Sequence, residues 1–263
     1  MVSHASKLVV KADTSVEDLV SHSEQHGLTN YAERLHPNNI ASVTSITDTA
    51  LANVYRVELL HHEPVAIKCV KHQTPYKRLK RATRELSCWS SYSHDNILPL
   101  LGFAVVSEGI AMVSPWIRNG RITDYVAHKP DCNRLELSSQ LVRAIAYLHA
   151  HEVVHGDVKR APEILLGSTD STKEADIYAL AATMTKIYTG EQPYNELYWN
   201  QARQKVISGQ LRPSRPIQLP IDAVGNGVWE LLNYCWAMNP NERPTSSEVD
   251  EWFQYYISFE IKS

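Results

Sequence analysis

The first clear pattern of hydrophobic and polar positions has a two-residue period. Residues 54–59 alternate and are rich in β-branched and aromatic side chains, which is typical of a strand. Residues 61–64 are polar and end in a proline, which predicts a turn, and residues 65–70 follow as a second strand. The pattern therefore predicts a β-hairpin, and strand character returns over residues 97–106 and 110–113.

Helical spacing dominates the rest of the chain. A helix is predicted after the hairpin because apolar residues recur on one face, at Leu79, Ala82, Leu86 and Trp89. Two further stripes have the same spacing, at Leu137, Leu141, Ala144, Ile145 and Leu148, and at Ile177, Leu180, Ala181, Met184 and Ile187. Gly190 follows the last stripe as a predicted C-cap, and residues 245–248 form a capping box that opens a final helix.

These elements predict an α+β protein in which residues 42–257 form one domain of two lobes. The small β-rich lobe spans residues 42–114, and the larger helical lobe spans residues 118–257. The connector lies near residues 115–117, and a cleft between the lobes is the expected ligand site.

Residues 1–41 are polar and mixed, and we expect them to be an N-terminal extension of that domain. Ser15 followed by Asp18 has the form of a helix start. Residues 28–35 predict a second short helix in the same segment.

Charge and composition limit the classes of partner. The 263 residues carry a formal net charge of -3, so no overall basic field attracts nucleic acid or anionic lipid. No apolar run has the length of a membrane span or a signal peptide. The cysteines form no C-x-x-C pair, which predicts free thiols in a reducing compartment. We therefore expect a cytoplasmic protein with a protein partner or substrate, and no contact with nucleic acid or membrane.

One local cluster of positive charge departs from this balance. Its members are Lys77, Arg78, Lys80, Arg81 and Arg84, all on the helix predicted after the hairpin. The sequence favours the interpretation that they form a solvated helix face.

A series of motifs runs in a fixed order between residues 42 and 255. Val65-Ala66-Ile67-Lys68 is followed by Glu85 on the next predicted helix and by MVSPWIRNG at residues 112–120. The segment His155-Gly156-Asp157-Val158-Lys159 comes next, then Ala161-Pro162-Glu163, then CWAMNPNERPT from Cys235. In this order the motifs resemble the eukaryotic protein kinase family, with the serine/threonine pattern and the Cys-Trp pair of its tyrosine-kinase-like branches.

The resemblance implies a nucleotide site. Lys68 would hold the α- and β-phosphates of ATP, and Glu85 would fix the position of that lysine. Four further residues would keep part of the adenine contacts, namely Val54 and Ala66 on the strands and Trp116 and Ile117 in the hinge segment.

The resemblance also implies a catalytic pair. Asp157 would act as the base that receives the proton of the substrate hydroxyl, and Lys159 two residues later matches the serine/threonine pattern. Gly156 stands where the family usually has an arginine, so regulation through that arginine by loop phosphorylation is not expected.

The metal site departs from the family pattern. The family holds two magnesium ions with an asparagine five residues after the base and with the aspartate of an Asp-Phe-Gly turn. The fifth residue after Asp157 is Pro162, which cannot bind a metal, and no D-x-G sequence occurs in the chain. A second alignment, in which Ile164-Leu165-Leu166 continues the catalytic loop, would make Glu163 a metal ligand. We assign no metal-binding residue.

The loop that covers the phosphates is also altered. Counting back from Val54, the three glycine positions of the family motif hold Thr47, Thr49 and Ala52. Glycines allow backbone amides to approach phosphate closely, whereas β-branched threonines resist that geometry. We therefore expect ATP to bind weakly or not at all, and magnesium to lack its ligands.

The interval between Asp157 and Ala161 contains only three residues, where the family has two strands, the metal-binding turn and the activation loop. The family buries the glutamate of Ala-Pro-Glu against an arginine, here Arg243. Because three residues span at most about 10 Å, either Glu163 keeps Arg243 and the catalytic loop is displaced, or the reverse holds.

Three interpretations follow. The first is a catalytically impaired member of the family, a pseudokinase or truncated form with a binding or scaffolding role. The second is an active ATP-dependent serine/threonine kinase that uses Asp157 in an unusual way. The third is that a coding segment was omitted in deriving this sequence, which the well-preserved flanks on both sides favour.

Overall fold

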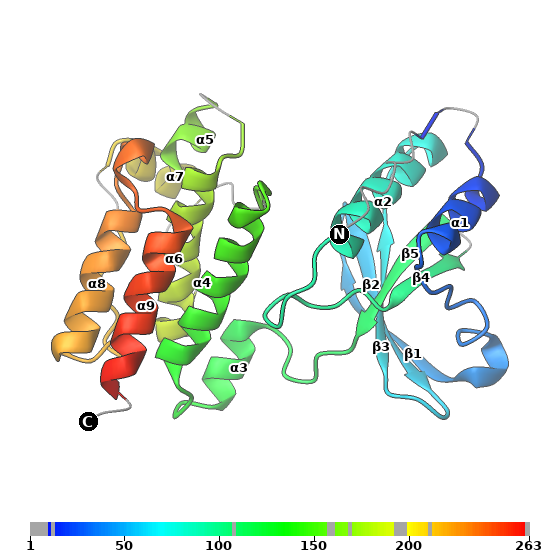
Figure 1. Cartoon of the computed structure of the whole chain (residues 1–263), viewed down its shortest axis with the longest axis horizontal. Helices are drawn as coiled ribbons and strands as arrows, with labels where there is room; N and C mark the ends of the chain where they lie inside the picture. The colour runs from blue at the N-terminus through cyan, green and yellow to red at the C-terminus, as the bar shows by residue number, and fades with distance from the viewer. Residues whose placement is uncertain are drawn as a thin grey trace. The chain divides into compact units, whose positions relative to one another are not determined.

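The computed structural model describes residues 10–11, 14–106, 109–156, 161–167, 170–191, 199–209 and 212–260. It divides into two compact units, Met1–Arg118 and Asn119–Ser263, called here the sheet unit and the helical unit (Figure 1). The first contains the β-sheet with two helices, and the second contains helices only among its described residues. The predicted α+β class, with a β-rich lobe followed by a helical lobe, is confirmed.

The sheet unit is built on five antiparallel strands in the order β1-β2-β3-β5-β4. Their bounds are β1 Ile40–Asp48, β2 Ala52–Leu59, β3 Val65–Val70, β4 Gly102–Val106 and β5 Gly109–Pro115. β2 and β3 form the predicted hairpin, with Val54 opposite Lys68. The strand expected from residue 97 begins only at Gly102, because residues 94–97 form a turn and Pro99 has no N–H to donate to a ladder.

Two helices cover one face of this sheet. α1 (Val16–Gln25) contributes Leu19, and α2 (Pro75–Ser90) contributes Leu79, Ala82 and Leu86 to a cluster with Met112 of β5. The predicted apolar stripe of α2 is therefore confirmed. Alternate residues of β3, including Val65 and Ile67, face the opposite side in a second cluster.

The described residues of the N-terminal segment are packed into the sheet unit. α1 begins at the predicted capping box, in which Ser15 and Asp18 exchange hydrogen bonds of 2.9 and 3.0 Å. The short helix expected over residues 28–35 is not formed. The backbone there pairs instead with Phe103 of the edge strand β4. The Phe103 amide donates to the Thr29 carbonyl oxygen (3.0 Å), and the Phe103 carbonyl oxygen accepts from the Tyr31 amide (2.8 Å). This strand pairing overrides the local helical preference.

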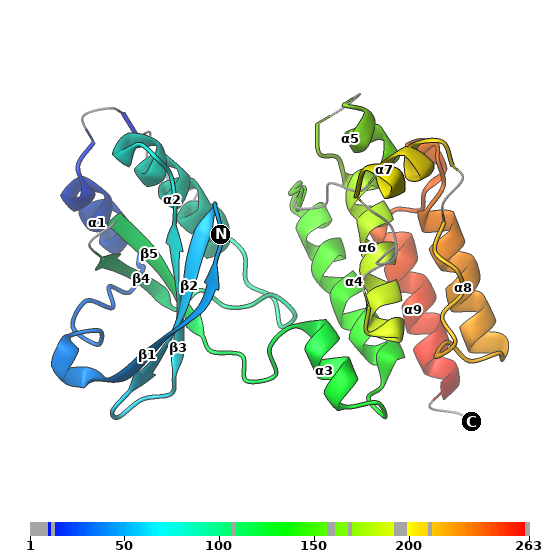
Figure 2. The ribbon, with the colours of Figure 1, turned by 180° about the vertical axis from the view of Figure 1, so that it is seen from behind.

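The helical unit contains α3 Ile122–His128, α4 Arg134–Ala150, α5 Pro162–Leu166, α6 Lys173–Thr189, α7 Trp199–Ile207, α8 Ala223–Cys235 and α9 Ser246–Glu260. α4, α6, α8 and α9 run side by side around its core (Figure 2). The predicted stripe of α6 is fully buried, and its C-cap Gly190 has the left-handed conformation. The capping box at the start of α9 is present, because Glu248 accepts from the Thr245 amide at 2.7 Å.

Two glycines inside α8 permit close approach of neighbouring segments. A Cβ atom at Gly225 would lie 1.9 Å from the carbonyl oxygen of Pro220, and one at Gly227 would lie 2.2 Å from the Tyr256 hydroxyl. Glycine in a helix costs about 1 kcal/mol relative to alanine. The packing of α8 therefore depends on residues that its own helical propensity disfavours.

Gly225→Ala is expected to lower the free energy of unfolding by about 1–3 kcal/mol, because the added methyl group displaces backbone that cannot rotate away. Gly227→Ala is expected to cost less, since the Tyr256 side chain can move. Urea unfolding of both variants measures the difference. A gain in stability for Gly225→Ala, as helix propensity alone predicts, would contradict this packing.

Candidate functional site

Lys68 and Glu85 form an ion pair in the sheet unit. Lys68 lies on β3 and Glu85 on α2, and both side chains are partly exposed. The pairing that the family resemblance implied is present. It places a fixed ammonium group beside the sheet face that α2 covers.

The other predicted strand residues share this sheet face. Residues directly opposite one another in an antiparallel pair point to the same side. Val54 lies opposite Lys68, and Ala66 lies two residues before Lys68 on the same strand. Both are half-buried. The structure therefore brings Val54, Ala66, Lys68 and Glu85 to one face.

The hinge segment follows β5 directly. The Trp116 amide donates to the Pro64 carbonyl oxygen at 3.1 Å, and Ile117 is 48% exposed. The Trp116 ring centre lies 5.3 Å from the guanidinium carbon of Arg56, which also pairs with Glu58. Sequence reasoning missed Arg56 as a neighbour of the site, although its position two residues after Val54 indicates the same sheet face.

The turn between β1 and β2 is closed by Thr49. Its hydroxyl accepts from the amides of Leu51 (3.3 Å) and Ala52 (3.1 Å) and donates to the Ala52 carbonyl at 2.9 Å. The Thr49 amide also bonds to Ala52, at 3.1 Å. Amides that a glycine loop would point at phosphate are therefore used within the turn itself.

The predicted catalytic residues Asp157 and Lys159 lie outside the described residues. The backbone just before them is held by Asp176 of α6. Its carboxylate accepts from the amides of His155 (2.7 Å) and Gly156 (2.9 Å). Gly156 has φ +66°, and a Cβ there would meet Ser171 at 3.2 Å, so the arginine usual in the family would be strained at this position.

Asp176 also binds His149, and both are almost fully buried. The Nε2 atom of His149 donates to Asp176 at 3.0 Å, and its Nδ1 lies 3.0 Å from the Ser246 hydroxyl. Burial alone would raise the pKa of the Asp176 carboxyl. The hydrogen bonds from His149, Gly156 and His155 together hold that pKa below its ordinary value.

Glu163 of α5 forms a buried bidentate pair with Arg243. The two distances are 2.6 Å from Nη1 to Oε1 and 2.8 Å from Nη2 to Oε2. Arg243 also donates to the carbonyl oxygens of Ala237 and Glu174, both at 2.9 Å. Glu163 therefore keeps Arg243, which is one half of the first arrangement that the sequence left open. The displacement of the catalytic loop that was expected with it falls on residues 157–160, outside the described residues.

Three histidines near the end of α4 do not converge. His149 is bound to Asp176, whereas His151 bonds to the Tyr147 carbonyl and His155 meets Asp176 only through its amide. Within the described ranges, no group of three or more His, Cys, Asp or Glu side chains is arranged to hold a metal ion. In the same part of the chain, no helix combines the length and apolar character needed to cross a membrane.

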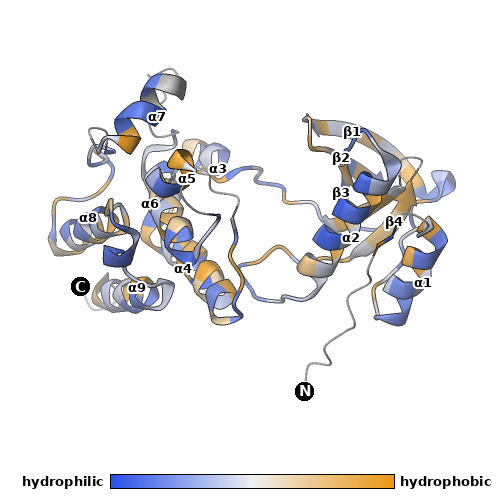
Figure 3. Cartoon of the chain, turned by 90° about the horizontal axis from the view of Figure 1, so that it is seen from above, coloured by the Kyte–Doolittle hydropathy of each residue, from blue (hydrophilic) through white to orange (hydrophobic). Residues whose placement is uncertain are grey.

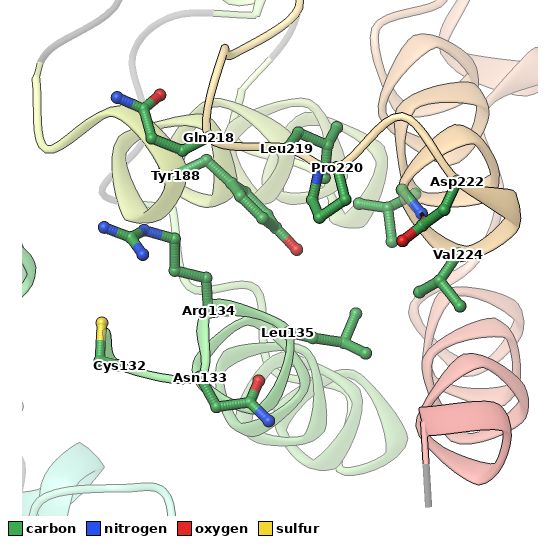
Figure 4. Close-up of a pocket in the computed structure, with 12 residues that line it drawn as sticks. Cys132, Asn133, Arg134, Leu135, Tyr188, Gln218, Leu219, Pro220, Asp222 and Val224 are labelled. Carbon is green, nitrogen blue, oxygen red and sulfur yellow. Dashed lines mark hydrogen bonds between the residues drawn. The ribbon is translucent and has the colours of Figure 1, made fainter. Parts of the chain in front are cut away.

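A separate pocket of about 340 Å³ lies in the helical unit (Figure 4). It is lined by residues at and just before the start of α4, by Tyr188 of α6, by the segment leading into α8, and by the first two turns of α8. Asn133 and Asp222 on its wall each cap a helix, accepting from the amides of Glu136 (2.9 Å) and Gly225 (2.7 Å). The residues predicted for nucleotide binding do not line it.

Comparison with known proteins agrees with the fold of the two units and with the ion pairs described above. The family model described as protein tyrosine and serine/threonine kinase matches residues 40–173 and 158–253, so residues 158–173 are matched twice.

Several curated kinases are similar to the chain. A probable serine/threonine-protein kinase of Dictyostelium discoideum is 24% identical over 70% of this chain and 24% of its own length. A probable cell division protein kinase of Encephalitozoon cuniculi is 26% identical over 72% of this chain and 86% of its own length. Mitogen-activated protein kinase kinase kinase 5 of Arabidopsis thaliana is 23% identical over 80% of this chain and 34% of its own length.

The matched region thus covers about a quarter to a third of the length of the Dictyostelium and Arabidopsis kinases. It covers most of the length of the Encephalitozoon kinase. The family match of this chain extends from residue 40 to residue 253, well over half of the sequence. The sheet unit with its Lys68–Glu85 pair and the helical unit with its buried Glu163–Arg243 pair agree with that match. The chain belongs to the protein tyrosine and serine/threonine kinase family.

Proposed function

We propose that this chain is a catalytically impaired member of the kinase family, with weak nucleotide affinity and a role in binding a partner protein. The observation that carries the proposal is the buried ion pair between Glu163 and Arg243. Both oxygens of the Glu163 carboxylate accept hydrogen bonds from Arg243, and the pair is buried. The one carboxylate that the second alignment offered as a metal ligand is therefore already used.

Magnesium does not fit the described residues of the catalytic segment. Turning Glu163 toward a metal would leave the Arg243 guanidinium buried and unpaired, which costs about 3–5 kcal/mol. Pro162 opens α5 and has no ligating atom. Family kinases use the metal to neutralise charge on the transferred phosphate. Without that neutralisation, transfer is expected to be slower by several orders of magnitude.

ATP fits the sheet unit in part. Lys68, held by Glu85, could meet the phosphates, and Val54 and Ala66 leave a half-buried apolar surface on the same face. The Thr49 hydroxyl weakens this binding, because it accepts hydrogen bonds from the amides of Leu51 and Ala52, which then cannot donate to phosphate. Weak ATP affinity without a metal requirement is the consequence.

A thermal-shift titration tests the proposal. One millimolar ATP is expected to raise the unfolding midpoint by no more than about 1–2 °C, and magnesium is expected to add nothing. Lys68→Met should remove the small ATP effect, while Lys129→Met, an exposed lysine of the helical unit, should leave it unchanged. A shift of several degrees that requires magnesium and is lost in Lys68→Met would overturn the proposal.

The second candidate function is an active serine/threonine kinase. One observation favours it: the residues just before Asp157 are fixed by Asp176, as a working catalytic loop requires. Transfer of labelled phosphate to a protein substrate by the purified chain, abolished in Asp157→Asn, would establish this function instead.

A further inference from the structure

The outward side of α2 carries four cations within eight residues, Lys77, Lys80, Arg81 and Arg84, called here the basic stripe. At about 100° per residue they occupy an arc of about 100° on the helix. The opposite side holds Leu79, Ala82 and Leu86, which are packed on the sheet. Figure 3 shows blue, hydrophilic bands along α2. Three of the four cations are exposed, and Arg81 is half-buried.

No carboxylate of the described chain neutralises the basic stripe. None of its four side chains forms an ion pair with a residue in the described ranges. The only acidic residue of α2 is Glu85, and it is bonded to Lys68. Within the stripe, cations three and four positions apart repel one another, which destabilises an isolated helix.

The helix dipole adds to this repulsion. The first turn of α2 contains no acidic residue, and its N-cap Thr74 makes no side-chain capping bond. Cations near a helix N-terminus face the positive end of the dipole and are unfavourable there. Of the four stripe cations, Lys77 lies in the first turn, where the dipole disfavours it. A bound anionic group would relieve this effect and the repulsion within the stripe.

We propose that the basic stripe is a docking surface for an acidic segment of a partner protein. Cations four residues apart are separated by about 6 Å along the helix axis. Alternate side chains of an extended peptide are about 6.6 Å apart. An acidic peptide lying along α2 can therefore place successive carboxylates opposite Lys77 and Arg81, or opposite Lys80 and Arg84.

Other polyanions fit less well. α2 cannot insert into a membrane, because its apolar side is packed against the sheet. Single-stranded nucleic acid is held by stacking on exposed aromatic rings as well as by charge. The aromatic ring on α2 nearest this stripe is Tyr76, and the Lys80 ammonium already lies 6.0 Å from its centre. The inference goes beyond the proposed function and stands whether or not the chain transfers phosphate.

Fluorescence anisotropy with a fluorescein-labelled octaglutamate peptide tests the docking surface on the full chain. The peptide is expected to bind, and to bind more weakly as salt rises. K80E/R84E is expected to weaken binding at least tenfold. The matched control K129E/K205E changes the net charge equally at exposed lysines of the helical unit, and a change of less than twofold is expected.

K80Q/R84Q, which removes charge without reversing it, should give an intermediate loss, and circular dichroism checks that all variants are folded. Absence of peptide binding overturns the proposal, as does an equal loss in the K129E/K205E control. Tighter, stripe-dependent binding to vesicles with 30% phosphatidylserine or to a 12-nucleotide single strand also overturns it, in favour of a lipid surface or a nucleic acid.

Discussion

Replacement of Arg243 by methionine is expected to lower the free energy of unfolding of the helical unit by about 3–5 kcal/mol. The substitution leaves the Glu163 carboxylate buried without its partner, and it also removes the donors to the carbonyl oxygens of Ala237 and Glu174. Methionine keeps much of the side-chain volume, so the loss reflects polar pairing more than a cavity. Urea unfolding followed by circular dichroism measures it, and hydrogen exchange locates the loss in α5 and α6.

The double variant E163Q/R243M provides the control. A neutral amide in place of the unpaired carboxylate is cheaper to bury, so the double variant is expected to recover part of the stability that R243M loses. The pair would not have the role described here if R243M changed stability by less than about 1 kcal/mol.

Asp176→Ala is expected to have an effect of similar size, about 3–5 kcal/mol. The substitution leaves three donors without their acceptor, namely the His149 ring and the amides of His155 and Gly156. Amide exchange at residues 155 and 156 should accelerate strongly. Ser246→Ala is the matched control, because it removes the other hydrogen bond of His149 and leaves both amides bound.

The contribution of Asp176 to the free energy of unfolding should decrease in acid. The pKa of its carboxyl is lowered in the folded state, so the ionised group stabilises the fold at pH values above its ordinary pKa of about 3.9. That contribution is lost as the pH falls through the still lower folded-state pKa. The stability difference between the wild type and Asp176→Ala should therefore shrink as the pH falls below about 4. An increase of the difference toward acid would contradict the assignment.

Local patterns predicted much of the fold. The β2–β3 hairpin, the apolar stripes of α2 and α6, and the capping boxes of α1 and α9 depend on neighbouring residues, so periodicity and capping chemistry revealed them. The prediction of a helix over residues 28–35 was wrong, because the backbone of this segment is hydrogen-bonded to Phe103, which is distant in the sequence. No local pattern carries that information.

The candidate site was predictable where a family motif names the residue. The Lys68–Glu85 pair is present, and its role in phosphate binding stays a prediction. Whether Glu163 pairs with Arg243 or is available to a metal depends on tertiary geometry, so the sequence left both alternatives open. The closing of the β1–β2 turn by Thr49 was missed, because a hydroxyl that accepts from two amides has no signature beyond the threonine itself.

The two ends of the shortened interval are anchored independently. Gly156 is bound to Asp176 on α6, and α5 directly after Ala161 is tied through Glu163 to Arg243. Neither anchor uses an atom of residues 157–160. By loop-closure entropy, each doubling of the number of residues between two fixed points costs only about 0.6 kcal/mol. The same scaffold could therefore carry splice forms or grafted inserts of very different length at this junction, with its two anchors unchanged.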